Sequence, residues 1–511
     1  MMILRQPDHV QCWTDSGLND SAAEVVIVHS GDTLQVELSA PNEAITQISL
    51  RWDKPMPEGI QIFCDHWERG YGDLEWRGMV PERILPWYAL TYNLQTAETQ
   101  GFGVETGGGA IASWRIDQSG ITLVLDVRCG DRGVLAGPRI IPMAIVKSLK
   151  SLPGESPFIF AKRFCRSLCP APRLPSFPVY GGNDWYYAYG NNSDETIRRD
   201  TTLIRSLSPN RENAPFMVID AGWFPAKGCY GGPYSIGNDN FPDLPGLAGW
   251  IKSQDVRPGI WIRPLLTAEA PASWHLPDSH PVVKMERGVF LDPSVPEVLE
   301  HVKQDIRRLH DWGYTLIKHD FSTFDITGRW GFQMGDGKLS SGGWTFADRT
   351  RTTAEIILSL YRAIREAAGD SLLIGCNTVG HLGAGLFELQ RTGDDTSGQE
   401  WERTRKMGIN TLAFRMPQNN TFFACDADCV GLTHAIPWEL NRQWLELLAK
   451  SGTPLFVSAD PKAVGPEQAA ALREAFTLAA TVLPEGEPMD WMHTTCPRRW
   501  KFGQEEKIFD F

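Results

Sequence analysis

After residue 178 the chain alternates between short apolar runs and longer amphipathic segments. Eight runs have the length of buried strands, and most are separated by stretches with apolar residues at three- and four-residue spacing. The runs cover residues 179–185, 216–220, 259–264, 316–320, 372–376, 386–391, 422–426 and 455–457, and the helical patterns include 195–207, 295–312, 352–368 and 438–449. This alternation predicts a (β/α)₈ barrel over 178–484. A doubly wound sheet is the alternative, but no glycine-rich dinucleotide-binding fingerprint follows an early strand.

The first 170 residues have a different pattern. Short runs rich in β-branched residues recur between turn formers, at 25–28, 33–38, 45–50, 87–92, 111–116 and 121–127. Gly107 to Gly109 and Ser119-Gly120 stand where hairpin turns are expected. Such strands without long helices predict an N-terminal antiparallel β-sandwich over 1–170. The proline-rich stretch 157–178 is expected to be an exit strand and linker, and 485–511 a short or truncated C-terminal β segment.

Composition narrows the class of protein. The 511 residues are too many for one ordinary domain, and the formal net charge of −13 argues against general nucleic-acid binding. The 19 tryptophans suit a carbohydrate ligand, because aromatic faces stack on sugar rings, although the count taken alone favours the filling of a core. The N-terminus lacks a basic segment followed by an apolar one, and no run of about 18 apolar residues occurs, so neither a signal peptide nor a membrane span is predicted.

The ten cysteines are scattered along the chain. The close pairs Cys165/Cys169 and Cys425/Cys429 have no second pair or nearby His at zinc-site spacing. Asp426 and Asp428 likewise lack a neighbouring His or Glu that would complete a metal site, so a substrate-binding or structural role is expected. These patterns predict free thiols, no metal and a cytoplasmic protein, and they leave the oligomeric state open, with a homo-oligomer among the alternatives.

Nearly every predicted barrel strand ends in polar side chains. They are Asn183-Asp184-Trp185, Asp220, Arg263, Lys318-His319-Asp320, Cys376-Asn377, residues 391–395, and Asp426 with Asp428. A single Asp would mean little, because Asp commonly caps helices. Repetition at the same end of every strand predicts the catalytic face of a barrel. Two carboxylates on different strands, Asp320 and one from 394–395, predict the nucleophile and acid of a glycoside hydrolase.

Lys318 and Asp320 are two residues apart, so on a strand they point the same way and His319 points the opposite way. A cation beside Asp320 would keep it ionised, as a nucleophile requires; a structural ion pair is the alternative. Asp394 is then expected to be the proton donor, held neutral by burial or by the charge of Asp320. Asp395 is the competing choice, since one of the adjacent pair could cap the following helix.

Together these stretches resemble glycoside hydrolase family 36, the α-galactosidase and melibiase group, and its relative family 27. The resemblance runs from the β-sandwich through the barrel. Residues 218–224 are similar to the family's Asp-Asp-Gly-Trp strand, 259–264 to its Gly-Leu-Trp-Phe-Glu-Pro strand, and 290–297 to the segment before the nucleophile strand. Lys318-His319-Asp320 matches the Lys-x-Asp nucleophile motif. Residues 393–395 and 425–429 are similar to the acid/base motif and to the Asn-Asp-Pro-Asp stretch of family 27.

The resemblance implies a retaining α-glycosidase that needs no metal or organic cofactor and acts on a small oligosaccharide or glycoside. It implies double displacement, with Asp320 as the nucleophile and Asp394 as the general acid/base. The residues proposed to bind the sugar are Asp220, Trp261, Lys318 and Cys376, to which Arg391, Arg287, Trp185 and Asp426 are added as candidates.

The chain departs from the family pattern at positions that recognise the sugar. Ala221 replaces the second Asp, Arg263 the Glu, Ser322 the Asn after the nucleophile, and Thr378 a small residue. Such changes alter sugar discrimination rather than bond cleavage. Galactose is therefore only the default sugar. A different sugar, possibly anionic and held by Arg263, and transfer to another sugar rather than to water are the alternatives.

Two other classes of protein fit part of the pattern. An aldolase-like lyase would form a Schiff base at Lys318. A non-catalytic protein would bind sugar on a barrel scaffold without turnover. The long connection 323–344, rich in glycine and containing Trp330 and Trp344, is expected to be either a lid over the pocket or a solvated excursion.

Overall fold

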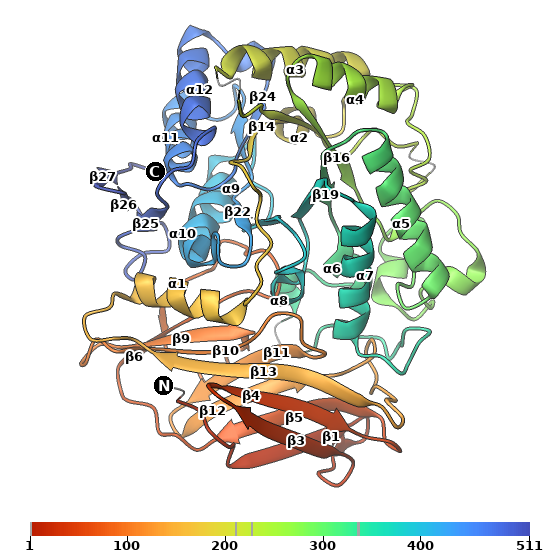
Figure 1. The fold of residues 1–511 in the computed structure, drawn as a ribbon, viewed down its shortest axis with the longest axis vertical. Helices are drawn as coiled ribbons and strands as arrows, with labels where there is room; N and C mark the ends of the chain where they lie inside the picture. Colours follow the sequence, from red (N-terminus) through yellow and green to blue (C-terminus); the bar gives the residue numbers. More distant parts are fainter. Residues whose placement is uncertain (1–2, 210–211, 226–227, 335–337) are drawn as a thin grey trace.

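The computed structural model describes residues 3–209, 212–225, 228–334 and 338–511, and it confirms the predicted fold class. Figure 1 shows the N-terminal β-sandwich, red to orange, beneath the (β/α)₈ barrel, which runs from yellow to blue. A small antiparallel sheet forms the C-terminal β segment, with β25 (Gly486–Pro488), β26 (Arg499–Phe502) and β27 (Glu505–Ile508). Within the described residues, no helix combines the length and the apolar character that a membrane crossing needs.

Two antiparallel sheets form the sandwich. One has the order β2 (Gly17–Leu18), β1 (His9–Thr14), β5 (Ile45–Trp52), β12 (Gly120–Asp126), β11 (Ile111–Asp117), β8 (Leu85–Pro86). The other has the order β3 (Glu24–Ser30), β4 (Thr33–Ser39), β13 (Ile140–Lys150), β10 (Thr99–Val104), β9 (Tyr88–Asn93), β6 (Ile60–Cys64), β7 (Arg77–Gly78). Trp114 bridges the sheets, with its ring centroid 6.2 Å from Trp52 on its own sheet and 6.2 Å from Phe102 on the facing one.

The two predicted hairpin turns have different outcomes. Ser119 and Gly120 lie at the turn between β11 and β12, where Asp117 pairs with Gly120, as predicted. Gly107 to Gly109 do not turn a hairpin, because β10 and β11 belong to different sheets. This segment crosses between the sheets, and a Cβ at Gly108 would lie 2.5 Å from the Met143 carbonyl oxygen. Close backbone approach, rather than a tight turn, therefore explains this glycine.

The expected exit strand after the sandwich is instead a helix, α1 (Pro157–Leu168). Ser156 caps it by accepting the Ile159 N–H at 3.3 Å, and Pro157 occupies the first turn, where a missing N–H costs nothing. Phe164 packs on β10 so closely that a Cβ at Gly101 would lie 2.7 Å from its ring. The prolines that suggested a linker lie mostly beyond the helix. The domain ranges 1–170, 178–484 and 485–511 stay predictions.

Parallel strands form the barrel. Its sheet has the order β22 (Ala424–Asp426), β21 (Leu389–Arg391), β20 (Leu372–Gly375), β19 (Leu316–His319), β16 (Arg257–Ile262), β15 (Phe216–Ile219), β14 (Tyr180–Asn183), β24 (Leu455–Ala459), β23 (Cys429–Leu432). The two strands at the ends of this order, β22 and β23, are separated in the chain only by Ala427 and Asp428. They act as one interrupted strand that closes the barrel. Asp428 adopts a left-handed φ of 71° at the interruption. The predicted seventh strand, 422–426, thus covered only its first half.

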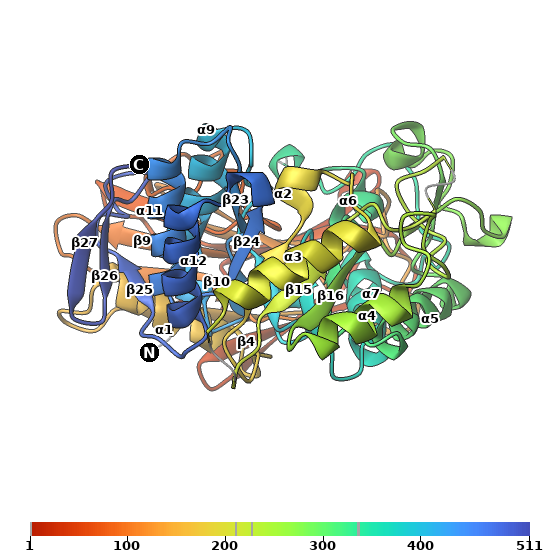
Figure 2. The ribbon, with the colours of Figure 1, turned by 90° about the horizontal axis from the view of Figure 1, so that it is seen from above.

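Helices cover the outside of the barrel in both views (Figures 1 and 2). They include α3 (Asp194–Leu207), α4 (Leu244–Ser253), α5 (Pro296–Asp311), α7 (Thr353–Ala367), α11 (Trp438–Lys450) and α12 (Pro466–Ala479). After β21 the helical segment runs through α9 (Trp401–Thr404), η4 (Arg405–Asn410), α10 (Thr411–Arg415) and η5 (Met416–Gln418). Shorter elements are α2 (Trp185–Ala188), α6 (Ser322–Thr327), β17 (Leu266–Thr267), β18 (Val289–Phe290), η1 (Ala272–Trp274), η2 (Pro281–Lys284), η3 (Gly331–Gln333) and η6 (Pro461–Ala463).

The sandwich packs against the barrel beside the one-turn helix α8 (Gly380–Gly383), which follows β20. The ring of Trp87 stacks on His381 at 5.7 Å, and Gly107 N–H donates to the His381 carbonyl. A buried ion pair spans the same junction. Arg415 Nε of α10 lies 2.9 Å from Asp65 Oδ1, and each side chain is at most 2% exposed. Arg415 also donates to the Thr392 and Glu68 carbonyl oxygens, so it joins both parts of the chain.

We expect Arg415→Met to lower the free energy of unfolding by about 3–5 kcal/mol, because it leaves the Asp65 carboxylate buried without its cation. Equilibrium urea denaturation measures the change. Arg473→Met, at an exposed position of α12, is the control, with an expected change within about 0.5 kcal/mol. A loss no larger than that of the control would contradict a role for this ion pair in holding the two parts together.

Candidate active site

Asp320 directly follows β19 and is held firmly in place. Its Oδ1 accepts the Phe321 N–H at 2.7 Å, and its Oδ2 accepts Trp261 Nε1–H at 3.2 Å. Phe321 adopts a left-handed φ of 63°, which costs a non-glycine residue on the order of 1–3 kcal/mol. The Asp320 side chain is buried but not sealed, with the residue 8% exposed. A strained turn thus fixes the direction of one carboxylate at the end of the strand.

The cation expected beside Asp320 pairs with another residue. Lys318 Nζ lies 2.7 Å from Asp220 Oδ2, and Asn183 Nδ2 donates to that same oxygen at 2.7 Å. Burial alone would lower the pKa of Lys318, but the Asp220 carboxylate outweighs it and holds that pKa well above its ordinary value. The amine is therefore protonated, whereas a Schiff-base lysine must be neutral to attack. His319 points away from this site, as predicted, and packs against Phe387 at 4.8 Å.

Arg391 and Cys376 lie near Lys318. Arg391 is fully buried, with Nη2 2.6 Å from Asp428 Oδ2 and Nη1 donating to Cys376 Sγ at 3.4 Å. Burial raises the pKa of the Cys376 thiol, and the charge of Asp320 raises it further. The thiol is therefore neutral, which is the opposite of what a nucleophilic cysteine needs.

The adjacent carboxylates Asp394 and Asp395 have different surroundings. Asp394 Oδ1 lies 2.8 Å from Arg69 Nη2, and its Oδ2 lies 2.8 Å from Arg403 Nη2. Its backbone N–H donates to the Gly70 carbonyl at 2.8 Å. Both carboxylate oxygens thus carry a charge-assisted contact, and Asp394 links the sandwich to the end of β21. The catalytic role expected for Asp394 stays a prediction.

Asp395 is more open, with 37% of its side chain exposed against 18% for Asp394. Its closest cationic atoms are Arg391 Nη2 at 3.4 Å and Arg69 Nη1 at 3.8 Å. Burial opposes its ionisation, but these guanidinium groups and Lys318 outweigh burial and hold its pKa below its ordinary value. Tyr230 lies near all three carboxylates. Burial raises the pKa of the Tyr230 phenol, and the charges of Asp220, Asp320 and Asp395 raise it further. Asp395 therefore shares its surroundings with Asp320.

The sandwich contributes residues to the site that the sequence pattern did not predict. Gly70 N–H donates to the Thr392 carbonyl at 2.8 Å, and Gly70 and Gly393 form a parallel β-bridge. The Arg69 guanidinium also stacks over the Trp330 ring at 5.1 Å. The sequence contains one indication of this role. Residues 65–71 follow a strand and combine Asp, His, Glu and Arg with Trp and Tyr, which is more charged and aromatic side chains than a simple turn needs. Such loops often carry function.

The long connection after β19 begins with α6 and then covers part of the site. Trp330 stacks on Phe324 at 4.4 Å and lies 5.5 Å from Phe321. Gly331 N–H donates to Glu68 Oε1 of the sandwich at 2.8 Å. The first part of the connection is therefore packed at the barrel mouth rather than solvated. Gly335 and Gly337 of the predicted lid lie outside the described residues.

Arg263 does not offer a free cation to a sugar. It is fully buried and forms three hydrogen bonds with Asp325, the shortest at 2.6 Å, and a fourth with Glu286 at 2.8 Å. Its guanidinium also stacks on Phe321 at 4.1 Å, beneath the strained turn that follows Asp320. The expectation that Arg263 holds an anionic sugar is therefore replaced by a structural role for this residue.

The remaining candidates are spread around the mouth. Arg287 lines a neighbouring cavity of about 460 Å³ together with Tyr230 and Phe321. Trp185 begins α2 and lies 5.7 Å from the Tyr189 ring, so it belongs to the end of β14 rather than to the Asp320 turn. Burial raises the pKa of Asp426 to about 6, and its Oδ1 accepts the Asp428 N–H. Within the described residues, no cluster of three His, Cys, Asp or Glu side chains forms a metal site.

Comparison with known proteins identifies the fold. No family model and no curated protein matches the sequence. Solved structures match it, among them the α-galactosidase TtGalA of Thermus thermophilus in complex with p-nitrophenyl α-D-galactopyranoside, at a TM-score of 0.62 and 16% identity. That alignment covers 96% of this chain and 99% of the other. The family 36 α-galactosidase AgaA of Geobacillus stearothermophilus matches at a TM-score of 0.65 and 13% identity, over 98% and 79% of the two chains. At such identities the likeness shows the fold alone.

A second carboxyl group, that of Asp184, forms a hydrogen bond with the backbone of Asp220. Asp184 Oδ1 accepts the Asp220 N–H at 2.7 Å, and its Oδ2 accepts Asn192 Nδ2–H at 2.6 Å. Burial, and then the charge of Asp220, raise the pKa of Asp184 to about 7. The folded protein thus keeps this carboxyl protonated in a pH range where the unfolded chain ionises it.

We expect this group to destabilise the fold progressively between about pH 4 and pH 7, since its pKa in the unfolded chain is about 4. Asp184→Asn should remove the effect. The stability of the variant relative to wild type should rise by about 2–3 kcal/mol between pH 5 and pH 8 in urea denaturation. Asn192 Oδ1, which has no described partner, can accept the new amide. Parallel pH dependences for wild type, Asp184→Asn and the exposed control Asp239→Asn would contradict the assignment.

Proposed function

We propose that the protein is a retaining α-glycosidase of the α-galactosidase type that hydrolyses terminal α-linked sugars. The observation that carries the proposal is the pair formed by Asp320, held by Trp261 and a strained turn, and Asp395, the open member of the adjacent pair. Both follow strands of one parallel barrel at the end where such barrels build active sites. The fold, shared with α-galactosidases solved with galactosides, supports the substrate class.

Double displacement assigns a role to each carboxylate. Asp320 attacks the anomeric carbon while Asp395 gives a proton to the leaving oxygen, so the glycosidic bond breaks as an ester to Asp320 forms. Asp395 then takes a proton from water, which attacks the same carbon and releases Asp320 with net retention. We assign the acid/base to Asp395 rather than to Asp394 because Arg69 and Arg403 occupy both oxygens of Asp394. The guanidinium groups near Asp395 lower its pKa and disfavour its acid form, so this role requires that a bound sugar, by excluding water from the carboxyl group, raise that pKa.

The charges around the site favour a neutral sugar. Lys318, Arg391 and Arg69 are matched by Asp220, Asp428 and Asp394, and Arg263 is neutralised by Asp325 and Glu286. A charged sugar would have to displace one of these carboxylates. Ala221 and Ser322 replace polar side chains of the family pattern. An α-galactoside is therefore the first substrate to test, and other neutral α-glycosides should be tested as well. Water or a second sugar can serve as the acceptor in this scheme.

The catalytic assignment predicts different responses to the leaving group. Asp395→Ala should lose about 100- to 10,000-fold in kcat/KM on an α-galactosyl disaccharide, whose leaving alcohol needs a proton. It should lose far less on p-nitrophenyl α-galactoside, whose phenolate leaves unaided. Asp320→Ala should lose activity on both substrates, since the proposed mechanism forms the ester at Asp320. Steady-state kinetics with both substrates measures these ratios.

Asp394→Asn is the matched control, because it removes charge at the neighbouring position and keeps the shape of the side chain. It should retain the wild-type ratio between the two substrates. A leaving-group-dependent loss in Asp394→Asn, with Asp395→Ala active, would reverse the assignment. Sugar binding without turnover in the wild type would instead favour a non-catalytic binding protein, and borohydride trapping of substrate at Lys318 would favour the Schiff-base lyase.

The low pKa of Asp395 has a consequence for the pH profile. Arg69 contributes to that low pKa, so Arg69→Gln should raise it and enlarge the protonated fraction of Asp395 at a given pH. On the disaccharide, the descending basic limb of kcat/KM should move to higher pH. On p-nitrophenyl α-galactoside, whose departure needs no acid, that limb should not move. An unchanged limb on the disaccharide would show that Arg69 does not act on the group that donates the proton.

A further inference from the structure

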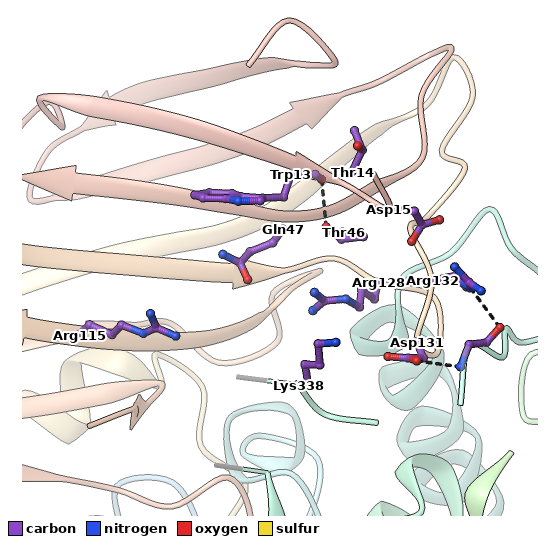
Figure 3. Close-up of a pocket in the computed structure, with 11 residues that line it drawn as sticks. Trp13, Thr14, Asp15, Thr46, Gln47, Arg115, Arg128, Asp131, Arg132 and Lys338 are labelled. Atoms are coloured by element: carbon purple, nitrogen blue, oxygen red, sulfur yellow. Dashed lines mark hydrogen bonds between the residues drawn. The ribbon is translucent and has the colours of Figure 1, made fainter. Parts of the chain in front are cut away.

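A second cavity lies between the sandwich and the later part of the β19–α7 connection (Figure 3). Its volume of about 610 Å³ is in the range of small-molecule sites. It shares none of its lining residues with the active site described above. Trp13 of β1 and Gln47 of β5 form one wall, and Lys338 of the connection stands opposite them.

Positive charge converges on this cavity. Figure 3 shows the side chains of Arg115 and Arg128 extending toward each other, with the Lys338 ammonium beside them. Arg128 contacts the buried Asp126, which offsets part of its charge. Arg115 and Lys338 are exposed to solvent at the cavity, and neither is joined by a salt bridge to another residue in the described ranges. In a chain of net charge −13, unmatched cations that face one concave space favour an anionic ligand.

Two acidic residues, Asp15 and Asp131, also line the cavity, against the four cations Arg115, Arg128, Arg132 and Lys338. Asp131 Oδ2 accepts the Gly343 N–H at 2.8 Å, and Arg132 Nε–H donates to the Gly343 carbonyl at 3.2 Å. Asp15 Oδ1 accepts the Gly133 N–H at 3.0 Å, and its Oδ2 lies 3.4 Å from Arg349. These contacts tie the connection to the sandwich and shape the walls. They leave Arg115 and Lys338 free for a ligand.

The opposite wall suits a sugar ring. Trp13 is only partly buried, and its indole ring borders the cavity above Gln47. An aromatic face packs against the apolar face of a pyranose, and a side-chain amide can both donate to and accept from hydroxyl groups. Inorganic anions would use the cations but not this wall.

We propose that this cavity is a second binding site for an acidic saccharide, separate from the barrel. The carboxylate or phosphate of the ligand lies among Arg115, Arg128 and Lys338, and its sugar ring packs on Trp13. Guanidinium groups bind either anion through charge-assisted hydrogen bonds. The site does not depend on the activity proposed for the barrel.

Isothermal titration of the full chain tests the proposal, in an Asp320→Asn background that prevents turnover. The probes are a glucuronate-containing disaccharide, a hexose 6-phosphate, a neutral disaccharide and inorganic phosphate. We expect one-to-one binding of at least one acidic saccharide, weaker or absent binding of the neutral one, and loss of affinity at higher salt. Comparison of the first two probes identifies whether carboxylate or phosphate is preferred.

The double variant Arg115→Gln/Lys338→Gln should weaken the acidic saccharide at least about tenfold. Trp13→Ala should weaken it too, while leaving inorganic phosphate unchanged. Arg473→Gln removes a cation from a distant exposed helix and should change nothing, and thermal unfolding checks that every variant is folded. Undiminished affinity in the double variant, or no binding of either acidic saccharide, would overturn the proposal. Equal affinity for inorganic phosphate with no effect of Trp13→Ala would overturn the saccharide assignment.

Discussion

The contact between Arg69 and Asp394 determines how the active site is built. It joins a loop of the sandwich to the end of β21, and it engages one of two adjacent carboxylates so that the other is left open. The Gly70–Gly393 bridge and the Arg415–Asp65 ion pair hold the same loop in place. The sandwich is therefore part of the mouth of the proposed active site. Without it, Asp394 would keep only Arg403 as a partner among the described residues, and Asp395 only Arg391.

Inside the barrel, buried charges are matched in pairs that set position more than stability. Lys318 with Asp220, and Arg391 with Asp428, each remove a charge from the pocket and fix the side chains around Cys376. Buried ion pairs of this kind contribute little net stability, because desolvation offsets their attraction. Their main effect is to hold the side chains in fixed positions. They leave Asp320 as a carboxylate with a hydrogen-bonded, directed oxygen and no ammonium partner of its own.

The parts of the structure that sequence reasoning predicted are those with local signals. The strand ending at Asp320 follows from an apolar run closed by polar residues, and α3, α5, α7 and α11 follow from helical periodicity. Asp428 interrupts the seventh strand in a left-handed conformation, so the pattern revealed only its first half. The helix α1 was missed because prolines beyond its end dominated the composition of the segment.

The details of the site depend on contacts between distant segments, which periodicity does not encode. Lys318 is near Asp320 in sequence but pairs with Asp220 across the barrel. The choice between Asp394 and Asp395 rests on Arg69, which belongs to the sandwich. The most direct test uses azide as a small nucleophile with Asp395→Ala and an activated α-galactoside, and NMR of the sugar product. Azide that replaces water should attack the ester at Asp320 and yield the α-galactosyl azide. Rescue of Asp394→Ala instead, or a β-azide from Asp395→Ala, would contradict the account.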